Sequence, residues 1–286
     1  MANHHFGKFA DIWKHLVVNE VLAGIQRVRY AETHAGSAAY PMVTDVEREY
    51  GVRGFLRGLE SVPALRTTPY ARTLARFMEA VPPMYPGSGL QAMELLGDSA
   101  AYLLCDVDPA SAKSLSDWAS RLGVGGCRVA QQDGMTSVRD WLRSGSGVAA
   151  VHIDPFDPFA HENGGPSAVE LASDIARGDH ALIYWYGYSR PDERAWAFSE
   201  IGAGEGSLLW CGDFMVTTLD GSSRSDGDLG KATTPGTGSG VVLANIPPGL
   251  LRSCEEIGRA LAHHYESVTL PTGEAGRLDF SIHVTQ

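Results

Sequence analysis

Strand-like and helix-like segments alternate along the chain after residue 98, and this alternation constrains the fold more than any other feature of the sequence. Apolar runs such as 101–108 and 147–156 have the length and composition of buried strands, whereas 110–122 and 167–177 repeat apolar residues at helical spacing. A helix between two strands returns the chain to the same end of the sheet, so successive strands pair in parallel. The sequence therefore predicts an α/β fold with a mostly parallel sheet covered by helices on both faces.

The predicted elements extend from residue 11 almost to the end of the chain. Strands are expected at 28–33, 101–108, 127–134, 147–156, 180–186, 207–216, 240–245 and 278–284. Helices are expected at 11–28, 88–97, 110–122, 135–143, 167–177, 190–201 and 250–264. The last strands indicate one antiparallel member, and the Gly/Ser/Asp/Thr-rich stretch 220–238 predicts a loop.

The segment 44–83 has a different composition. It is rich in Arg, Glu and Leu at helical spacing, which predicts a small helical subdomain inserted into a single domain of residues 1–286. The formal net charge of −11 argues against a broad basic face for binding a phosphate backbone. A local basic patch stays open, because this segment holds a group of arginines: Arg48, Arg53, Arg57, Arg66, Arg72 and Arg76.

The composition also bears on the cellular compartment. No apolar run reaches the roughly 18 residues that a membrane helix needs, and the first residues carry charges and histidines where a secretory signal would be apolar. A cytoplasmic location without a membrane partner is therefore expected. The cysteines lie far apart without a C-x-x-C pair, which predicts buried, reduced thiols. They are Cys105, Cys127, Cys211 and Cys254.

Acidic residues follow the first four parallel strands at the edge where such a sheet binds ligands. These positions are Glu32, Asp106, Asp133 and Asp154. Asp and Gly are also common turn residues after strands, so each position alone has a simpler explanation. Four acids in register favour a shared ligand.

An adenosine ligand suits this arrangement. Gly36 lets the backbone approach the ligand closely, Asp106 can accept from both ribose hydroxyls, and Asp133, beside Gly134, can accept from the adenine amino group. The chain has neither the G-x-G-x-x-G motif of dinucleotide folds nor a G-x-x-x-x-G-K-[ST] motif. S-adenosylmethionine, which carries adenosine without a pyrophosphate, is therefore the expected cofactor.

The fourth of these strands ends in Asp154-Pro155-Phe156, which resembles the D-P-P-[YFW] motif of amino-group methyltransferases. In that chemistry a carboxylate accepts from the acceptor's amino group, the proline keeps the turn rigid, and an aromatic ring packs on the flat acceptor. An ordinary proline turn explains the same residues.

The motifs together resemble a family, the bacterial RlmJ-type methyltransferases of an adenine N6 in large-subunit ribosomal RNA. The similar segments occur in the family's order along almost the whole chain: FADIWKH, THAG, YPGS, DVDP, DG, IDPF and SGVVLANIPP. The resemblance implies a Rossmann-like class I methyltransferase sheet with a small helical insertion. It also implies cofactor contacts from His15, His34, Ser88, Asp106, Asp133 and Gly134, and catalysis by Asp154.

Some of these positions keep a second interpretation. His15 could be a core histidine, Ser88 could serve as a helix N-cap as well as a cofactor contact, and Asp108 competes with Asp106 for the ribose. Lys14 is expected to point elsewhere, to phosphate or solvent. No metal site is expected, because the adjacent pairs His4-His5 and His263-His264 point to different sides of an element.

The acceptor motif departs from the family. Phe156 and Asp157 stand where the family has its second proline and its aromatic, so the ring that packs on the acceptor is shifted or is supplied by Phe159. Tyr186 or Tyr188 could also line an acceptor pocket, while Trp185 is expected in the core. The residues expected to bind the cofactor match the family's motifs, whereas those expected to bind the acceptor do not. This difference points to a different acceptor.

Three functions follow. The first is S-adenosylmethionine-dependent N-methylation of an amine-bearing small molecule or a nucleobase. The second is N6 methylation of ribosomal RNA, which requires a continuous basic surface and salt-sensitive binding. The third is a non-catalytic protein that binds the cofactor.

Overall fold

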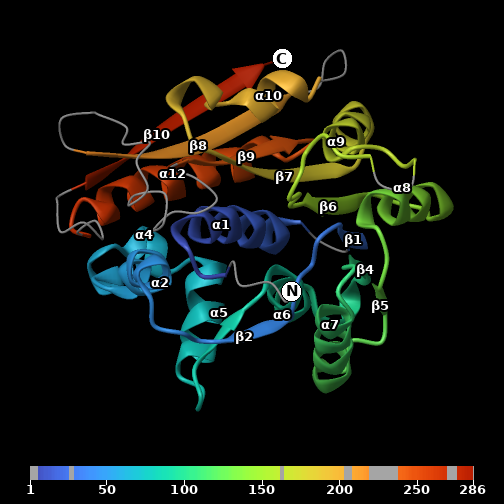
Figure 1. Cartoon of the computed structure of the whole chain (residues 1–286), viewed down its shortest axis with the longest axis horizontal. Helices are drawn as coiled ribbons and strands as arrows, with labels where there is room; N and C mark the ends of the chain where they lie inside the picture. Colours follow the sequence, from blue (N-terminus) through green and yellow to red (C-terminus); the bar gives the residue numbers. More distant parts are fainter. Residues whose placement is uncertain are drawn as a thin grey trace.

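The computed structural model describes residues 6–25, 29–161, 164–202, 208–218, 238–268 and 276–285. Its main sheet has eight strands in the order β10-β8-β9-β7-β6-β1-β4-β5 (Figure 1). The strands are β1 (Arg29–Glu32), β4 (Ala101–Cys105), β5 (Cys127–Ala130), β6 (Ala149–Ile153), β7 (Ala181–Tyr188), β8 (Leu209–Thr218), β9 (Gly238–Ala244) and β10 (Gly276–Thr285). The predicted mostly parallel, Rossmann-like α/β sheet is confirmed.

The strands from β5 to β7 pair in parallel, whereas β9 is antiparallel to both β7 and β8, and β10 is antiparallel to β8. Two strands, β9 and β10, therefore run against the rest, and the prediction of one antiparallel strand is wrong. The apolar pattern of a strand is the same in either direction, so the sequence could not give the direction of each strand.

Helices cover both faces of the sheet, as predicted. One face carries α1 (Phe9–Gly24), α6 (Ser88–Leu96), α7 (Pro109–Leu122) and α12 (Pro248–Tyr265) over the larger apolar core. The other carries α8 (Gly134–Ser144), α9 (Ala168–Arg177) and α10 (Trp196–Glu200) over a second core. Side chains alternate between these faces along each strand, which is why Ile183 and Trp185 of β7 lie in the first core while Tyr184 and Tyr186 lie in the second.

The segment 44–83 is helical. It holds α2 (Val46–Tyr50), α3 (Val52–Leu56), α4 (Pro63–Arg66) and α5 (Pro69–Met78), with the short 3-10 turn Leu59–Ser61. Asp45 and Thr68 cap α2 and α5 by accepting from backbone N–H groups. Helix α5 packs on α1, and α4 packs on α12. Figure 1 shows α2 and α4 next to α12. Its status as a separate subdomain of one domain stays a prediction.

Several predicted boundaries move. An antiparallel ribbon of β2 (Ala39–Pro41) and β3 (Met84–Pro86) flanks the helical segment and was not foreseen. The helix expected at 190–201 is a 3-10 turn, Pro191–Glu193, followed by α10. The expected loop at 220–238 lies outside the described residues apart from Gly238. All four cysteines are free thiols, and three of them are buried. Within the described ranges, no helix has both the length and the apolar character to cross a bilayer.

Candidate functional site

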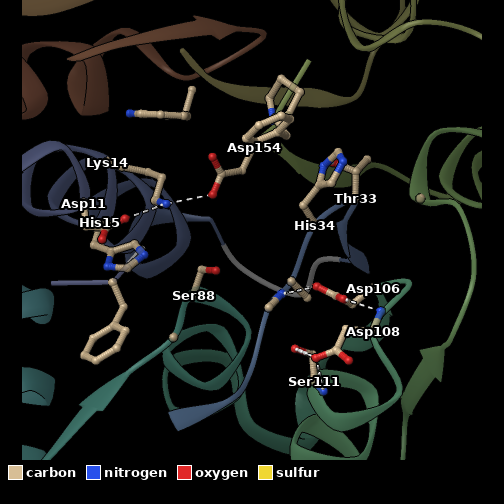
Figure 2. Close-up of a pocket in the computed structure, with 18 of the residues that line it drawn as sticks. Asp11, Lys14, His15, Thr33, His34, Ser88, Asp106, Asp108, Ser111 and Asp154 are labelled. Atoms are coloured by element: carbon tan, nitrogen blue, oxygen red, sulfur yellow. Dashed lines mark hydrogen bonds and ion pairs between the residues drawn. The ribbon is translucent and has the colours of Figure 1, made fainter. Parts of the chain in front are cut away.

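A cavity of about 500 Å³ lies at the carboxyl ends of β1, β4, β5 and β6, facing α1 (Figure 2). Its place follows from the topology: the chain leaves β1 toward β4 and β5, then crosses to β6 on the other side of β1. Connections diverge at such a switch point and leave a crevice for ligands. The ten residues that were expected to bind the cofactor or to form the catalytic turn all line this cavity: His15, His34, Gly36, Ser88, Asp106, Asp133, Gly134, Asp154, Pro155 and Phe156.

Asp106 joins two loops of the cavity wall. Its Oδ2 accepts from the backbone N–H of Gly36 at 2.8 Å, and its Oδ1 accepts from that of Asp108 at 2.8 Å. Gly36 has a φ of 61°, a left-handed conformation that favours glycine. The contact draws the loops after β1 and β4 together, and each carboxylate oxygen can still accept from a ligand hydroxyl.

Asp108 and Asp133 are helix caps that also line the cavity. Asp108 accepts from the Ser111 N–H at 3.3 Å at the start of α7, and Asp133 accepts from the Thr136 N–H at 3.0 Å at the start of α8. Capping therefore explains why an aspartate stands at each position. Both side chains still line the cavity and can also contact a ligand. Asp106 holds a loop rather than a helix, which distinguishes it from Asp108.

Gly134 is fixed by close packing at the start of α8. A Cβ on this residue would lie 2.0 Å from the carbonyl oxygen of Thr33, a backbone atom of the loop after β1. No side chain fits there without moving one of the two loops. The glycine therefore sets how closely the β1 and β5 ends of the cavity approach each other.

Lys14 connects α1 to the end of β6. Its Nζ lies 2.7 Å from Asp154 Oδ2 and 2.8 Å from Asp11 Oδ1 (Figure 2), and Lys14 is buried. Burial opposes its charge, but attraction to Asp11 and Asp154 prevails and raises the Lys14 pKa above its usual 10.5. The expectation that Lys14 points to phosphate or solvent is wrong. Helix α1 is buried from Phe9 through Asn19, so its side chains meet protein in almost every direction.

His15 is a core residue that also lines the cavity. Its Nδ1 lies 2.8 Å from Tyr85 OH and 3.1 Å from Gln91 Nε2, and the Gln91 amide also donates to Pro86 O at 2.7 Å. Burial, then the charge of Lys14, then His152 hold the His15 pKa well below 6.5. The ring is therefore neutral at pH 7, and a neutral imidazole offers one N–H donor.

Ser88 and Glu32 differ from expectation. The N-cap of α6 is Gly87, and Ser88 is the first helical residue, whose hydroxyl donates to Glu32 Oε1. Glu32 is fully buried, and its carboxylate also accepts hydrogen bonds from His152 Nδ1 at 2.9 Å and from Tyr30 OH at 3.1 Å. It does not line the cavity, so the first of the four strand-end acids supports the site from behind.

The aromatic residues follow the prediction only in part. Trp185 lies in the first core, as predicted, and it also lines the cavity, with its Nε1 donating to Ser239 at 3.0 Å. Tyr186 and Tyr188, which were candidates for an acceptor pocket, face the second core. Phe156 lines the cavity and is 98% exposed, while Phe159 packs on Trp196 with ring centroids 5.5 Å apart. Of the two phenylalanines that were expected to pack on the acceptor, Phe156 is therefore the one that a ligand in the cavity can reach. Alternation along β7 predicts that Trp185 and Tyr186 face opposite sides, but the sequence does not say which faces the site.

The histidine pairs form no metal site in the described part of the chain. His4 and His5 lie outside it, His263 Nδ1 contacts Glu266 at 3.2 Å, and His264 Nε2 contacts Gly54 O at 3.2 Å. Across the described ranges, no three His, Cys, Asp or Glu side chains are grouped as metal ligands.

The remaining predicted contact, His34, is half-buried on the wall formed by the loop after β1. Its Nδ1 lies 3.0 Å from Thr33 Oγ1.

The sequence missed several other lining residues: Phe6, Lys8, Asp11, Lys14, Tyr40, Tyr85, Val107, Ser111 and Trp185. For Lys14 a usable signal existed, because Asp11 and Lys14 are three residues apart on a helix and can pair.

Comparison with known proteins places the fold. No family model matches the chain, and no curated protein matches its sequence. A crystal structure of protein LPL1258 from Legionella pneumophila, described with the family model DUF519, is similar over 99% of this chain and 98% of that chain, with a TM-score of 0.72 and 17% identity. A SAM-dependent methyltransferase from Agrobacterium tumefaciens is similar over 85% of this chain and 64% of its own, with a TM-score of 0.43 and 13% identity. The likeness to the Legionella protein shows a shared fold along the whole chain.

Proposed function

We propose that the protein is an S-adenosylmethionine-dependent N-methyltransferase and a divergent member of the RlmJ type. The observation that carries the proposal is the convergence on one cavity of the glycine and acidic residues after β1, β4 and β5 with the Asp154-Pro155-Phe156 turn after β6. The resemblance to the RlmJ-type motifs implies that these same residues contact the cofactor and that Asp154 is the catalytic acid. The shared fold with the Legionella protein is compatible with it.

The lining residues fit the cofactor. Gly36 and Gly134 allow backbone to approach adenosine, Asp106 and Asp133 offer carboxylate oxygens to ribose and adenine, and neutral His15 offers an N–H. Ser88 stands beside His15 on this wall as a further contact. When bound, S-adenosylmethionine supplies a methyl group on a positively charged sulfur, which the lone pair of an amine can take with release of the neutral thioether.

Asp154 is proposed to hold the acceptor. Its Oδ2 accepts a hydrogen bond from Lys14 Nζ. Within the described ranges no side chain donates to Oδ1, which can therefore accept from an amino N–H of the acceptor. A carboxylate held in this way orients the nitrogen lone pair and favours the positive charge that develops on nitrogen. Pro155 stiffens the turn, and Phe156 offers its exposed ring to the acceptor.

A small amine is favoured over folded RNA as the acceptor. RNA binding needs basic side chains that are available to phosphate, and five of the six arginines of 44–83 contact carboxylates. These pairs are Arg48 with Asp45, Arg53 and Arg57 with Glu49, Arg66 with Glu60, and Arg76 with Glu94. Ribosomal RNA methylation remains the second candidate because the motif order resembles that family.

Radiolabelled cofactor tests the proposal with two acceptor pools, undermodified ribosomal RNA and a small-molecule extract. We expect label in the small molecules, and we expect Asp154→Asn to abolish transfer while cofactor affinity stays within about twofold. Asp157→Asn is the matched control, because Asp157 follows the turn and accepts from the Phe159 N–H. Cofactor binding without transfer to either pool would leave the non-catalytic alternative standing.

A further inference from the structure

Resting on this proposed function, we propose that the acceptor is an uncharged planar amine without a phosphate group. A heteroaromatic amine such as a free nucleobase or nucleoside belongs to this class, whereas a nucleotide or polynucleotide does not. The inference comes from the charges in the cavity, the charges around it, and the exposed ring of Phe156 on its wall.

The cavity wall carries an excess of negative charge. Five aspartates line it against two lysines: Asp11, Asp106, Asp108, Asp133 and Asp154 against Lys8 and Lys14. Each lysine is bonded to protein carboxylates, Lys14 to Asp11 and Asp154, and Lys8 to Glu47 at 2.7 Å. Both lining cations therefore already have anionic partners. A cleft lined mainly by one sign of charge concentrates ligands of the opposite sign and repels those of its own sign.

His15 adds no positive charge at neutral pH. The ring is buried, and its lowered pKa keeps it neutral. A phosphate entering the cavity would meet five carboxylates and no histidinium at this position. A positively charged cofactor meets the opposite condition, so the same wall serves the cofactor and excludes an anionic acceptor.

The helical segment beside the cavity gives a polyanion no compensating surface. Residues 44–83 hold six arginines and five acids: Asp45, Glu47, Glu49, Glu60 and Glu79. The remaining arginine, Arg72, donates to the backbone oxygen of Thr67. Because the acids offset almost all of the arginine charge, this segment has a net charge close to zero and attracts a phosphate backbone only weakly.

Phe156 supplies the attraction that charge does not. It is 98% exposed beside Asp154, and within the described ranges its ring has no aromatic partner. A planar ligand ring would cover this apolar surface and present an exocyclic amino group to Asp154. The combination of an apolar face with an N–H donor describes a heteroaromatic amine.

The first experiment uses the small-molecule extract and labelled cofactor, followed by anion exchange of the products at neutral pH. We expect the labelled product in the unretained fraction. Label that elutes only with salt, at the position of phosphorylated compounds, would overturn the inference while leaving N-methylation intact. Label in neither small molecules nor RNA would contradict the proposed function itself.

The second experiment compares adenosine with adenosine 5′-monophosphate, a pair that differs only in the phosphate. We expect kcat/KM to be at least tenfold higher for adenosine, and the ratio to narrow as ionic strength rises from about 0.01 M to about 0.15 M, because the screening length falls. Equal or better use of the monophosphate, or of a short RNA, would overturn the inference.

A pair of variants tests the role of the ring. Phe156→Ala should raise KM for adenosine about tenfold with little change in cofactor affinity, whereas Phe159→Ala, whose ring packs on Trp196 outside the cavity, should change KM much less. Equal effects of the two variants on KM would contradict the assignment of Phe156.

Discussion

The two walls of the cavity are held by different kinds of contact. On the proposed cofactor wall, formed by Gly36, Asp106, Asp133 and Gly134, each carboxylate accepts from backbone N–H groups: Asp106 from loop residues, and Asp133 from the first turn of α8. On the acceptor wall, formed by Asp11, Lys14, Asp154 and Trp185, one lysine joins two carboxylates, one of them 140 residues away. A contact from a side chain to a backbone N–H is lost only when that one side chain changes, whereas the loss of a shared buried counter-ion leaves two carboxylates without their partner. The predictions below test this contrast, beginning with the largest expected effect.

Lys14→Met should cause the largest loss. Two carboxylates would remain in a buried site without their cation, and removing one partner of a buried pair costs about 3–5 kcal/mol. We expect the free energy of unfolding, measured by urea denaturation, to fall by about this amount, with methyl transfer abolished. Lys113→Met is the control: it breaks an exposed pair with Asp117 and should cost less than about 1 kcal/mol. Equal losses in the two variants would mean that Lys14 is not the counter-ion described above.

Asp106→Ala should act mainly on the cofactor. Removing the carboxylate deletes contacts to two backbone N–H groups and the proposed contacts to ribose, and lost bonds to a charged group cost about 1–3 kcal/mol. Isothermal titration with S-adenosylhomocysteine should show cofactor affinity reduced by that amount. Asp108→Ala should reduce affinity less, because Asp108 caps α7. The reverse ranking would assign the ribose to Asp108.

Gly134→Ala tests the packing between the two loops of the cofactor wall. The added Cβ would approach Thr33 O to 2.0 Å, and forced overpacking costs about 1–3 kcal/mol. We expect lower stability in urea together with weaker cofactor binding. Gly178→Ala is the matched control, because its Cβ would meet its nearest neighbours at 3.6 Å. A Gly134→Ala variant as stable as that control would show that the loops move apart freely.

The His15 pKa predicts a smaller, pH-dependent effect. Because this pKa lies well below 6.5, the unfolded chain binds a proton in a pH range where the folded protein keeps His15 neutral. The free energy of unfolding is therefore unaffected by His15 above about pH 6.5. As the pH falls below that value, it decreases by up to about 1.4 kcal/mol per pH unit. Unfolding free energies at pH 7 and pH 5 should differ less in His15→Gln than in the native protein. An unchanged difference would mean that His15 titrates alike in both states.

The same contrast explains what the sequence could predict. Asp106, Asp133 and Gly134 follow strands with clear patterns, so counting along the chain was enough to bring them to one edge. The Lys14 to Asp154 contact depends on how α1 docks on the sheet, which a helical pattern does not specify. Glu32 carried the right chemistry at a strand end, but its side chain turns toward His152 and Ser88. Local patterns predicted the elements, while side-chain direction depended on packing between distant segments.

The separation of Lys14 from Asp154 also bears on synthesis of the chain. The lysine leaves the ribosome 140 residues before Asp154, and folding during synthesis begins with the N-terminal part of a chain. Until β6 has been made, Lys14 can pair with Asp11 but not with Asp154. The proposed acceptor side of the cavity is thus completed only after β6 and Asp154 have been made, later than the loops after β1, β4 and β5 that are proposed to bind the cofactor.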